Sequence, residues 1–140
     1  MPSGEVFVDA GAWIALSDRR DTHHAEAVAI QRRLLREHAR LVTTNLVLGE
    51  AHIAIRRLGG FDPALRFLVS LRESARLLRI YADEALETEA EQLLRRYDVH
   101  DLSLADAVSF AVMTSRGISD AFGFDRHFAT AGFSLVRADK

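Results

Sequence analysis

Short apolar runs alternate along the chain with longer segments in which apolar residues recur every three or four positions. The short runs are typical of buried strands and predict strands at 5–8, 40–43, 76–81, 118–122 and 133–137. The periodic segments predict helices at 11–17, 22–38, 45–58, 62–74, 83–97, 103–116 and 125–131. Strands that alternate with helices favour an α/β fold, in which helices cover both faces of a mainly parallel sheet.

Several helix ends carry specific signals. Thr22 is a candidate N-cap for the second helix, which we expect to run to about His38. The pair at 59–60, both glycine, is a natural stop for the third helix. Asp62 followed by Pro63 predicts the start of the fourth helix, with the aspartate as cap and proline at the first helical position.

Composition narrows the class of protein. The chain has 140 residues, of which 49% are hydrophobic and 27% charged, so we expect a single domain over 1–140. With 18 basic and 20 acidic residues the net charge is −2, which provides no global positive field to attract nucleic acid. The absence of cysteine excludes disulfides, thiolate zinc sites and cysteine nucleophiles. The sequence has neither a membrane-length apolar run nor a secretory signal, so we expect a cytoplasmic protein.

Four acidic residues stand in positions that local structure makes unusual: Asp9, Glu50, Asp106 and Asp125. Asp9 and Asp125 follow predicted strands and precede helices, while Glu50 and Asp106 lie near the N-terminal ends of their helices. A parallel α/β sheet places all such junctions at one edge. We therefore expect the four carboxylates to converge there.

Each of these carboxylates also has a structural interpretation. Asp9 and Asp125 stand where helix N-caps are expected, and Asp106 resembles the acidic member of a capping box that begins at Ser103. The helical neighbours of Glu50 are all apolar, namely Leu46, Val47, Ile53 and Ala54. Glu50 therefore projects from the core-facing stripe, where an ion pair with an arginine would also stabilise it.

Four carboxylates at one edge repel one another, by on the order of 4 kcal/mol per pair at about 4 Å and an effective dielectric of about 20. Such a cluster needs either divalent cations or a bound proton. All-oxygen ligation fits Mg²⁺ or Mn²⁺ better than Zn²⁺. Because such an ion activates water and neutralises charge on a phosphodiester, the sequence favours metal-dependent hydrolysis of a nucleic-acid backbone.

Four segments carry a resemblance to a known family: VFVDAGAWIAL at 6–16, TTNLVLGE at 43–50, LSLADAVSFAVM at 102–113 and AFGFDRHFATAGF at 121–133. With these motifs in this order, the chain resembles PIN-domain ribonucleases, and in particular VapC-type toxins of toxin–antitoxin systems. The resemblance implies a PIN-like α/β/α sandwich around a mainly parallel sheet. It also implies a Mg²⁺-dependent endoribonuclease, with Mn²⁺ as an alternative ion, that is the toxin of a type II pair.

The same resemblance assigns roles and partners. Asp9 and Asp106 would be the principal metal ligands, and Glu50 and Asp125 would complete the metal shell or orient the attacking water. RNA would be the substrate. The partners implied are a small antitoxin, whose C-terminal segment covers the site, and a second copy of the chain in a homodimer.

The chain departs from the family pattern close to the acidic residues. Ala10 and Gly11 stand where the family often has Thr or Ser, and Gly123 stands two positions before the last acid, where a hydroxyl is also common. Loss of these hydroxyls would weaken metal binding. A second interpretation is therefore a catalytically silent PIN-fold module that binds RNA or protein. A receiver-like phosphoacceptor is disfavoured, because the only lysine is Lys140.

Two further features have alternative interpretations. His127 lies two residues after Asp125 and could either contact an RNA phosphate or pack at the surface. Since none of the six histidines pairs with another at the spacing of a zinc motif, we expect no histidine metal site. The helix at 62–74 is more apolar than one sheet face requires, which suggests a dimer or antitoxin groove, although core packing would also explain it.

Overall fold

A parallel sheet forms the centre of the molecule. The computed structural model describes residues 4–98 and 100–139, so Lys140 lies outside the described residues. Within this part of the chain the strands are β1 (Glu5–Val8), β2 (Arg40–Thr44), β3 (Leu77–Ile80), β4 (Asp120–Phe122) and β5 (Ser134–Leu135). All neighbouring strands pair in parallel, in the order β3-β2-β1-β4-β5.

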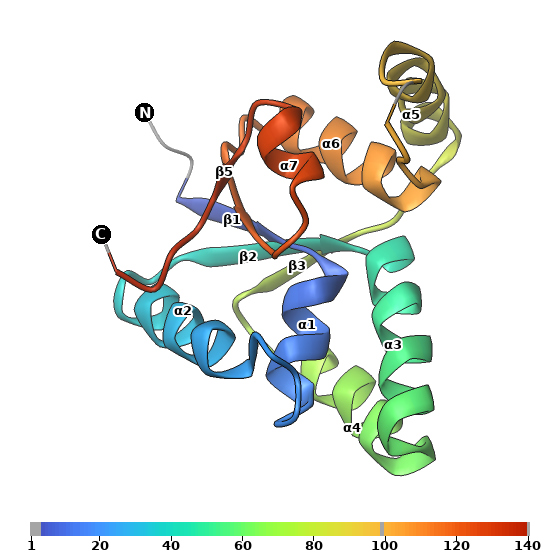
Figure 1. Ribbon diagram of the computed structural model, residues 1–140. Coiled ribbons are helices and arrows are strands. Elements are labelled where there is room, and N and C mark those ends of the chain that lie inside the picture. Colours follow the sequence, from blue (N-terminus) through green and yellow to red (C-terminus); the bar gives the residue numbers. More distant parts are fainter. Residues whose placement is uncertain (1–3, 99, 140) are drawn as a thin grey trace.

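Helices cover the two faces of this sheet (Figure 1). One face carries α1 (Ala10–Ser17), α2 (His24–Arg36), α3 (Asn45–Gly59) and α4 (Phe61–Arg72). The other carries α5 (Glu84–Arg96), α6 (Leu104–Arg116) and the short α7 (His127–Thr130). The predicted α/β/α sandwich around a mainly parallel sheet is confirmed.

Helix α6 is buried along most of its length. All residues from Ala107 to Met113 are buried, so α6 is enclosed on every side rather than along one stripe. Phe110 packs edge-to-face on Phe128 with ring centroids 5.1 Å apart, and Phe128 in turn lies 6.3 Å from Phe7 of β1. This aromatic contact fixes α6 and α7 against the central strand.

An ion pair at the C-terminal end of α6 shows which way this helix runs along the sheet. Arg116 donates to both carboxylate oxygens of Glu5, at 3.2 and 2.8 Å, and Glu5 is the first residue of β1. The C-terminal end of α6 therefore lies at the edge where β1 begins. Its N-terminal end, with Asp106, lies at the opposite edge, where the parallel strands end.

The predicted ends of α2 are wrong. We expected a Thr22 cap, but α2 begins at His24 because Asp21 accepts a hydrogen bond from the backbone N–H of His23 (2.8 Å) and holds a separate turn. The helix stops at Arg36, before His38, whose backbone takes the left-handed conformation with φ 55°.

The predicted start of α4 is also wrong. The helix begins at Phe61, directly after Gly60, whose φ of 91° lets the chain turn from α3 into α4 within one residue. Asp62 is therefore not the cap. Pro63 occupies the third helical position, which is tolerated because the first backbone N–H groups of a helix have no partner within it. The C-terminal end is Arg72 rather than Ser74.

The last elements are shorter than predicted. Ile118 stays outside β4 because its N–H donates to the carbonyl of Met113 (2.8 Å), closing the turn that Gly117 makes at the end of α6. Strand β5 covers only Ser134–Leu135, and α7 begins at His127 rather than at Asp125. Among the described residues, every helix is too short or too polar to cross a membrane.

Candidate active site

The strand order places a topological switch point between β1 and β4. From β1 the chain moves outward to β2 and β3 on one side, and later returns to pair β4 with the other side of β1. In open parallel sheets, ligands bind in the crevice at the carboxyl ends of strands at such a point. Asp9 directly follows β1, and Asp125 lies three residues after β4.

Asp9 is a buried carboxylate without a capping role. It occupies the N-cap position of α1, yet its side chain makes no cap hydrogen bond, so the cap interpretation is wrong. Only 6% of the residue is exposed. Burial raises its pKa to about 7, with further increases from the charges of Asp106, Glu50 and Asp125 and an opposing effect from the Ala10 backbone N–H. The four predicted carboxylates therefore interact electrostatically.

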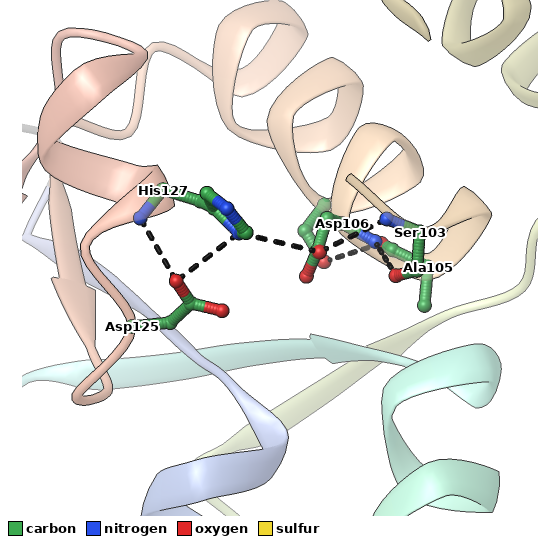
Figure 2. Close-up of polar contacts among 6 residues, drawn as sticks. Ser103, Ala105, Asp106, Asp125 and His127 are labelled. Atoms are coloured by element: carbon green, nitrogen blue, oxygen red, sulfur yellow. Dashed lines mark hydrogen bonds and ion pairs between the residues drawn. The ribbon is translucent and has the colours of Figure 1, made fainter. Parts of the chain in front are cut away.

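Asp106 makes the capping box and also faces the cluster. The Ser103 hydroxyl accepts from the Asp106 N–H at 3.1 Å, and Asp106 Oδ2 accepts from the Ser103 N–H at 3.2 Å. The structural interpretation is thus confirmed. The same Oδ2 lies 3.8 Å from Nδ1 of His127, as Figure 2 shows. The cap holds the Asp106 carboxylate in one orientation, toward the end of β4.

Asp125 is fixed by a turn rather than by a helix cap. Its Oδ1 accepts from the backbone N–H of His127 at 2.9 Å and lies 3.1 Å from Nδ1 of the same residue (Figure 2). The side chain is 41% exposed, so it borders solvent at the edge of the cluster. Asp125 and Asp106 both approach the same ring nitrogen of His127, Nδ1 (Figure 2).

Glu50 lies at the rim, contrary to the expectation of a core-facing position. It is exposed in the second turn of α3, and its neighbour Ile53 is 43% exposed, because this face of α3 is left uncovered by the sheet. The pKa of Glu50 is nevertheless raised, first by partial burial of the carboxylate and then by the charges of Asp106 and Asp125. Glu50 therefore faces the other acids from across the crevice.

His127 is the site residue that sequence reasoning did not assign. Its Nδ1 is buried, has no hydrogen-bond partner, and lies between two carboxylates. One donor atom each from Asp106, Asp125 and His127 lie within 4.8 Å of one another, close enough to share a metal ion. The one sequence feature that indicated His127 was its position two residues after Asp125. The contact with Asp106 on another element could not be deduced from spacing.

These residues fit a hard divalent cation. Carboxylate oxygens are the donors that Mg²⁺ and Mn²⁺ prefer. Burial raises the pKa of Asp9 most, and the charges of the other three acids raise it further, so a bound cation would stabilise the ionised carboxylate. The buried Nδ1 of His127 makes no hydrogen bond although it lies 3.1 Å from Oδ1 of Asp125, and a cation bound between the two atoms would satisfy both.

Gly123 gives a structural reason for one departure from the family pattern. A Cβ at this position would lie 3.1 Å from the Cβ of Asp9, closer than side chains normally approach. At Gly11, by contrast, a Cβ would meet Phe124 at an ordinary 3.9 Å. Glycine at 123 therefore lets the end of β4 pass directly against Asp9.

A groove of about 630 Å³ runs beside this strand end. It is lined by Gly123, Phe124 and His23, and by residues from the last part of the chain, among them Phe133 and Arg137. The rings of His23 and Phe124 stack in parallel, with centroids 4.2 Å apart and an interplanar angle of 8°. Since Gly123 packs on Asp9 and Phe124 precedes Asp125, the groove lies beside the segments that carry these two acids.

A parallel sheet that gathers acidic residues at its switch point is the architecture predicted from the PIN motifs. The PIN domain family matches residues 6–134, and the chain belongs to this family. The chain is 36% identical over 135 residues to the 23S rRNA-specific endonuclease VapC20 of Mycobacterium tuberculosis, from strains CDC 1551 / Oshkosh and H37Rv. The alignment covers 96% of this chain and 99% of VapC20.

A solved structure gives the same result. The crystal structure of M. tuberculosis VapC20, a sarcin–ricin loop cleaving toxin, matches with a TM-score of 0.84 and 35% identity. The match covers 94% of this chain and 98% of that one. The predicted resemblance to VapC-type toxins is therefore confirmed.

Proposed function

We propose that this protein is a divalent-metal-dependent endoribonuclease that hydrolyses RNA phosphodiester bonds as the toxin of a type II toxin–antitoxin pair. The observation that carries the proposal is the electrostatic convergence of Asp9, Glu50, Asp106 and Asp125 at the switch point. The similarity to VapC20, a 23S rRNA-specific endonuclease, supports RNA as the substrate and ribosomal RNA as the class to test first.

In this proposal Asp9 and Asp106 are the principal ligands of Mg²⁺, with Mn²⁺ as an alternative, and Glu50 and Asp125 complete the set. The ion would supply Lewis acidity toward a phosphoryl oxygen and activation of water. Hydrogen bonds from the Ser103 and His127 backbones hold Asp106 and Asp125 in place before any ligand arrives. Such fixed ligands avoid reorganisation during the reaction.

Glu50 is suited to a different task from Asp9. It lies on the exposed rim, where water and RNA have access, and its raised pKa moves it toward the range in which a carboxylate accepts a proton efficiently. We assign Glu50 the role of orienting the attacking water and taking its proton. Asp9, buried beneath the rim, provides fixed negative charge for the ion.

The groove beside the site gives the RNA a path to these residues. Stacking of a base on an aromatic side chain contributes about 1–3 kcal/mol, and it suits single-stranded loops. We infer that a nucleobase stacks at the His23–Phe124 pair while Arg137 contacts a phosphate. Recognition of this kind needs only local positive charge, in agreement with the net charge of −2.

The apolar surface of α4 supports the proposed protein partners. Phe67 and Leu71 of this helix are buried, so core packing explains part of its apolar character. Phe61, Leu65 and Val69 follow one another at four-residue intervals and are 56%, 46% and 45% exposed. We propose that a second copy of the chain covers this stripe in a homodimer, and that the antitoxin covers the acidic residues.

The deciding experiment is RNA cleavage by protein freed of metal with EDTA and then supplied with Mg²⁺ or Mn²⁺. Purified 23S rRNA and total cellular RNA would be incubated with the wild type and with Asp106→Asn, and new ends would be mapped by sequencing. We expect discrete ends that require both the ion and Asp106. RNA binding without ion-dependent cleavage would instead support the catalytically silent module that Ala10, Gly11 and Gly123 suggested.

A further inference from the structure

The imidazole of His127 is enclosed in an unusual environment for a surface-proximal histidine. Its Nδ1 lies 3.1 Å from Oδ1 of Asp125 and 3.8 Å from Oδ2 of Asp106, and it is buried without a hydrogen-bond partner. The carboxylate oxygens are themselves occupied by backbone N–H groups, at 2.9 Å for Asp125 and 3.2 Å for Asp106. These backbone bonds hold both carboxylates close to the same ring nitrogen, Nδ1.

Nδ1 therefore faces two acceptors. In the neutral tautomer that carries its proton on Nε2, Nδ1 has a lone pair and is a third acceptor beside the two carboxylates. A single cation can then bind all three acceptor atoms. The donor atoms of the three residues lie within 4.8 Å of one another. The His127 side chain is 28% exposed, yet its Nδ1 is buried and lies beside both carboxylates.

We propose that Nδ1 of His127 is a direct ligand of the divalent ion together with Asp106 and Asp125, and that it gives the site a preference for Mn²⁺ over Mg²⁺. This inference rests on the proposed metal site and adds a ligand and a selectivity to it. Imidazole nitrogen suits first-row transition metals, whereas Mg²⁺ prefers oxygen donors. It also revises the expectation, based on zinc-motif spacing, that no histidine binds metal.

A direct test is pulsed electron paramagnetic resonance of Mn²⁺ added to the metal-free wild-type protein. A coordinated imidazole nitrogen couples magnetically to the Mn²⁺ electrons, and labelling histidine with ¹⁵N changes that coupling in a characteristic way. We expect a nitrogen coupling that responds to the label. Bound Mn²⁺ with no histidine coupling would overturn the proposal.

Two substitutions then measure selectivity. His127→Leu removes the donor, and His127→Asn places an amide oxygen close to the position of Nδ1. We expect the ratio of Mn²⁺ to Mg²⁺ affinity, measured by calorimetric titration, to fall by at least about tenfold in both. The matched control is His100→Asn, an exposed histidine whose ring contacts Tyr97, and it should retain the wild-type ratio.

The outcomes separate this inference from the proposed function. If His127 only pairs as a cation with the two carboxylates, both variants will change Mn²⁺ and Mg²⁺ affinity alike, and the ligand assignment is wrong. If Mn²⁺ binds without histidine coupling and RNA is still cleaved, the proposed function stands without this ligand. If neither ion binds and RNA stays intact, the proposed function itself is wrong.

Discussion

Replacing Asp9 by asparagine should stabilise the metal-free protein, by an amount that grows with pH. The pKa of Asp9 rises from an ordinary 3.8 to about 7 in the folded state, mainly through burial. Between these two values the unfolded chain has released the proton while the folded chain still holds it. Raising the pH therefore favours unfolding, with the full effect reached above about pH 7.

The size of the effect follows from the shift. A rise of about three pKa units, at 1.36 kcal/mol per unit, amounts to about 4 kcal/mol of lost stability at high pH. About 1.7 kcal/mol of this is already lost at about pH 5, so the gap should widen by roughly 2.5 kcal/mol between about pH 5 and about pH 8. Asparagine keeps the shape of the side chain and cannot ionise, which removes this dependence.

Urea unfolding in EDTA checks this expectation, with wild type and Asp9→Asn compared across the pH range. Asp62→Asn is the matched control, since it removes an exposed carboxylate on α4. We expect the advantage of Asp9→Asn to grow with pH and that of the control to stay constant. An advantage for Asp9→Asn that is independent of pH would refute the reasoning, because it would mean that Asp9 ionises equally in both states.

Four further predictions concern activity, metal, RNA and assembly. Asp106→Asn should lose RNA cleavage while keeping the fold. Ser103→Ala should lower the free energy of urea unfolding by about 1 kcal/mol but keep most of the cleavage, since the backbone N–H of residue 103 still holds the Asp106 carboxylate. Equal losses of cleavage in the two variants would contradict a catalytic role of Asp106 beyond its cap. Mg²⁺ at about 100 times its dissociation constant should raise the wild-type unfolding free energy by about 2.7 kcal/mol, and an equal rise in Asp106→Asn would place the ion elsewhere. His23→Ala should weaken RNA binding by about 5- to 150-fold in a filter-binding assay while His23→Phe restores it, and full affinity in the alanine variant would exclude stacking there. Leu65→Asp should give a monomer in light scattering where the wild type is a dimer; a wild type that is monomeric at high concentration would exclude the homodimer.

The sheet could be predicted because buried parallel strands are continuous apolar runs. The segment at 5–8 and the one at 40–43 match β1 and β2 closely, since both of their faces are covered by helices. Strands at the edge beyond β4 were overestimated, because the apolar residues at 133–137 also pack without forming ladder pairs. The one-residue turn at Gly60 was not predicted, because the Asp62–Pro63 pair indicated a later start for α4.

The convergence of the acidic residues was predictable from topology, but their environments were not. Parallel strand ends meet at one edge, which was sufficient to bring Asp9 and Asp125 together with Asp106. The exposure of Glu50 depends on which face of α3 the sheet leaves uncovered. The position of His127 beside Asp106 depends on how α7 packs on α6, through Phe128 and Phe110. Both are set by tertiary contacts rather than by local pattern.

Anomalous diffraction from crystals soaked in Mn²⁺ tests the central claim most directly, because it locates the ion relative to each carboxylate. The account predicts a manganese peak at the carboxyl ends of β1 and β4, bound by oxygens of Asp9, Asp106 and Asp125. A crystal saturated with Mn²⁺ that shows no peak among these residues, or shows them turned away from one another, would contradict it.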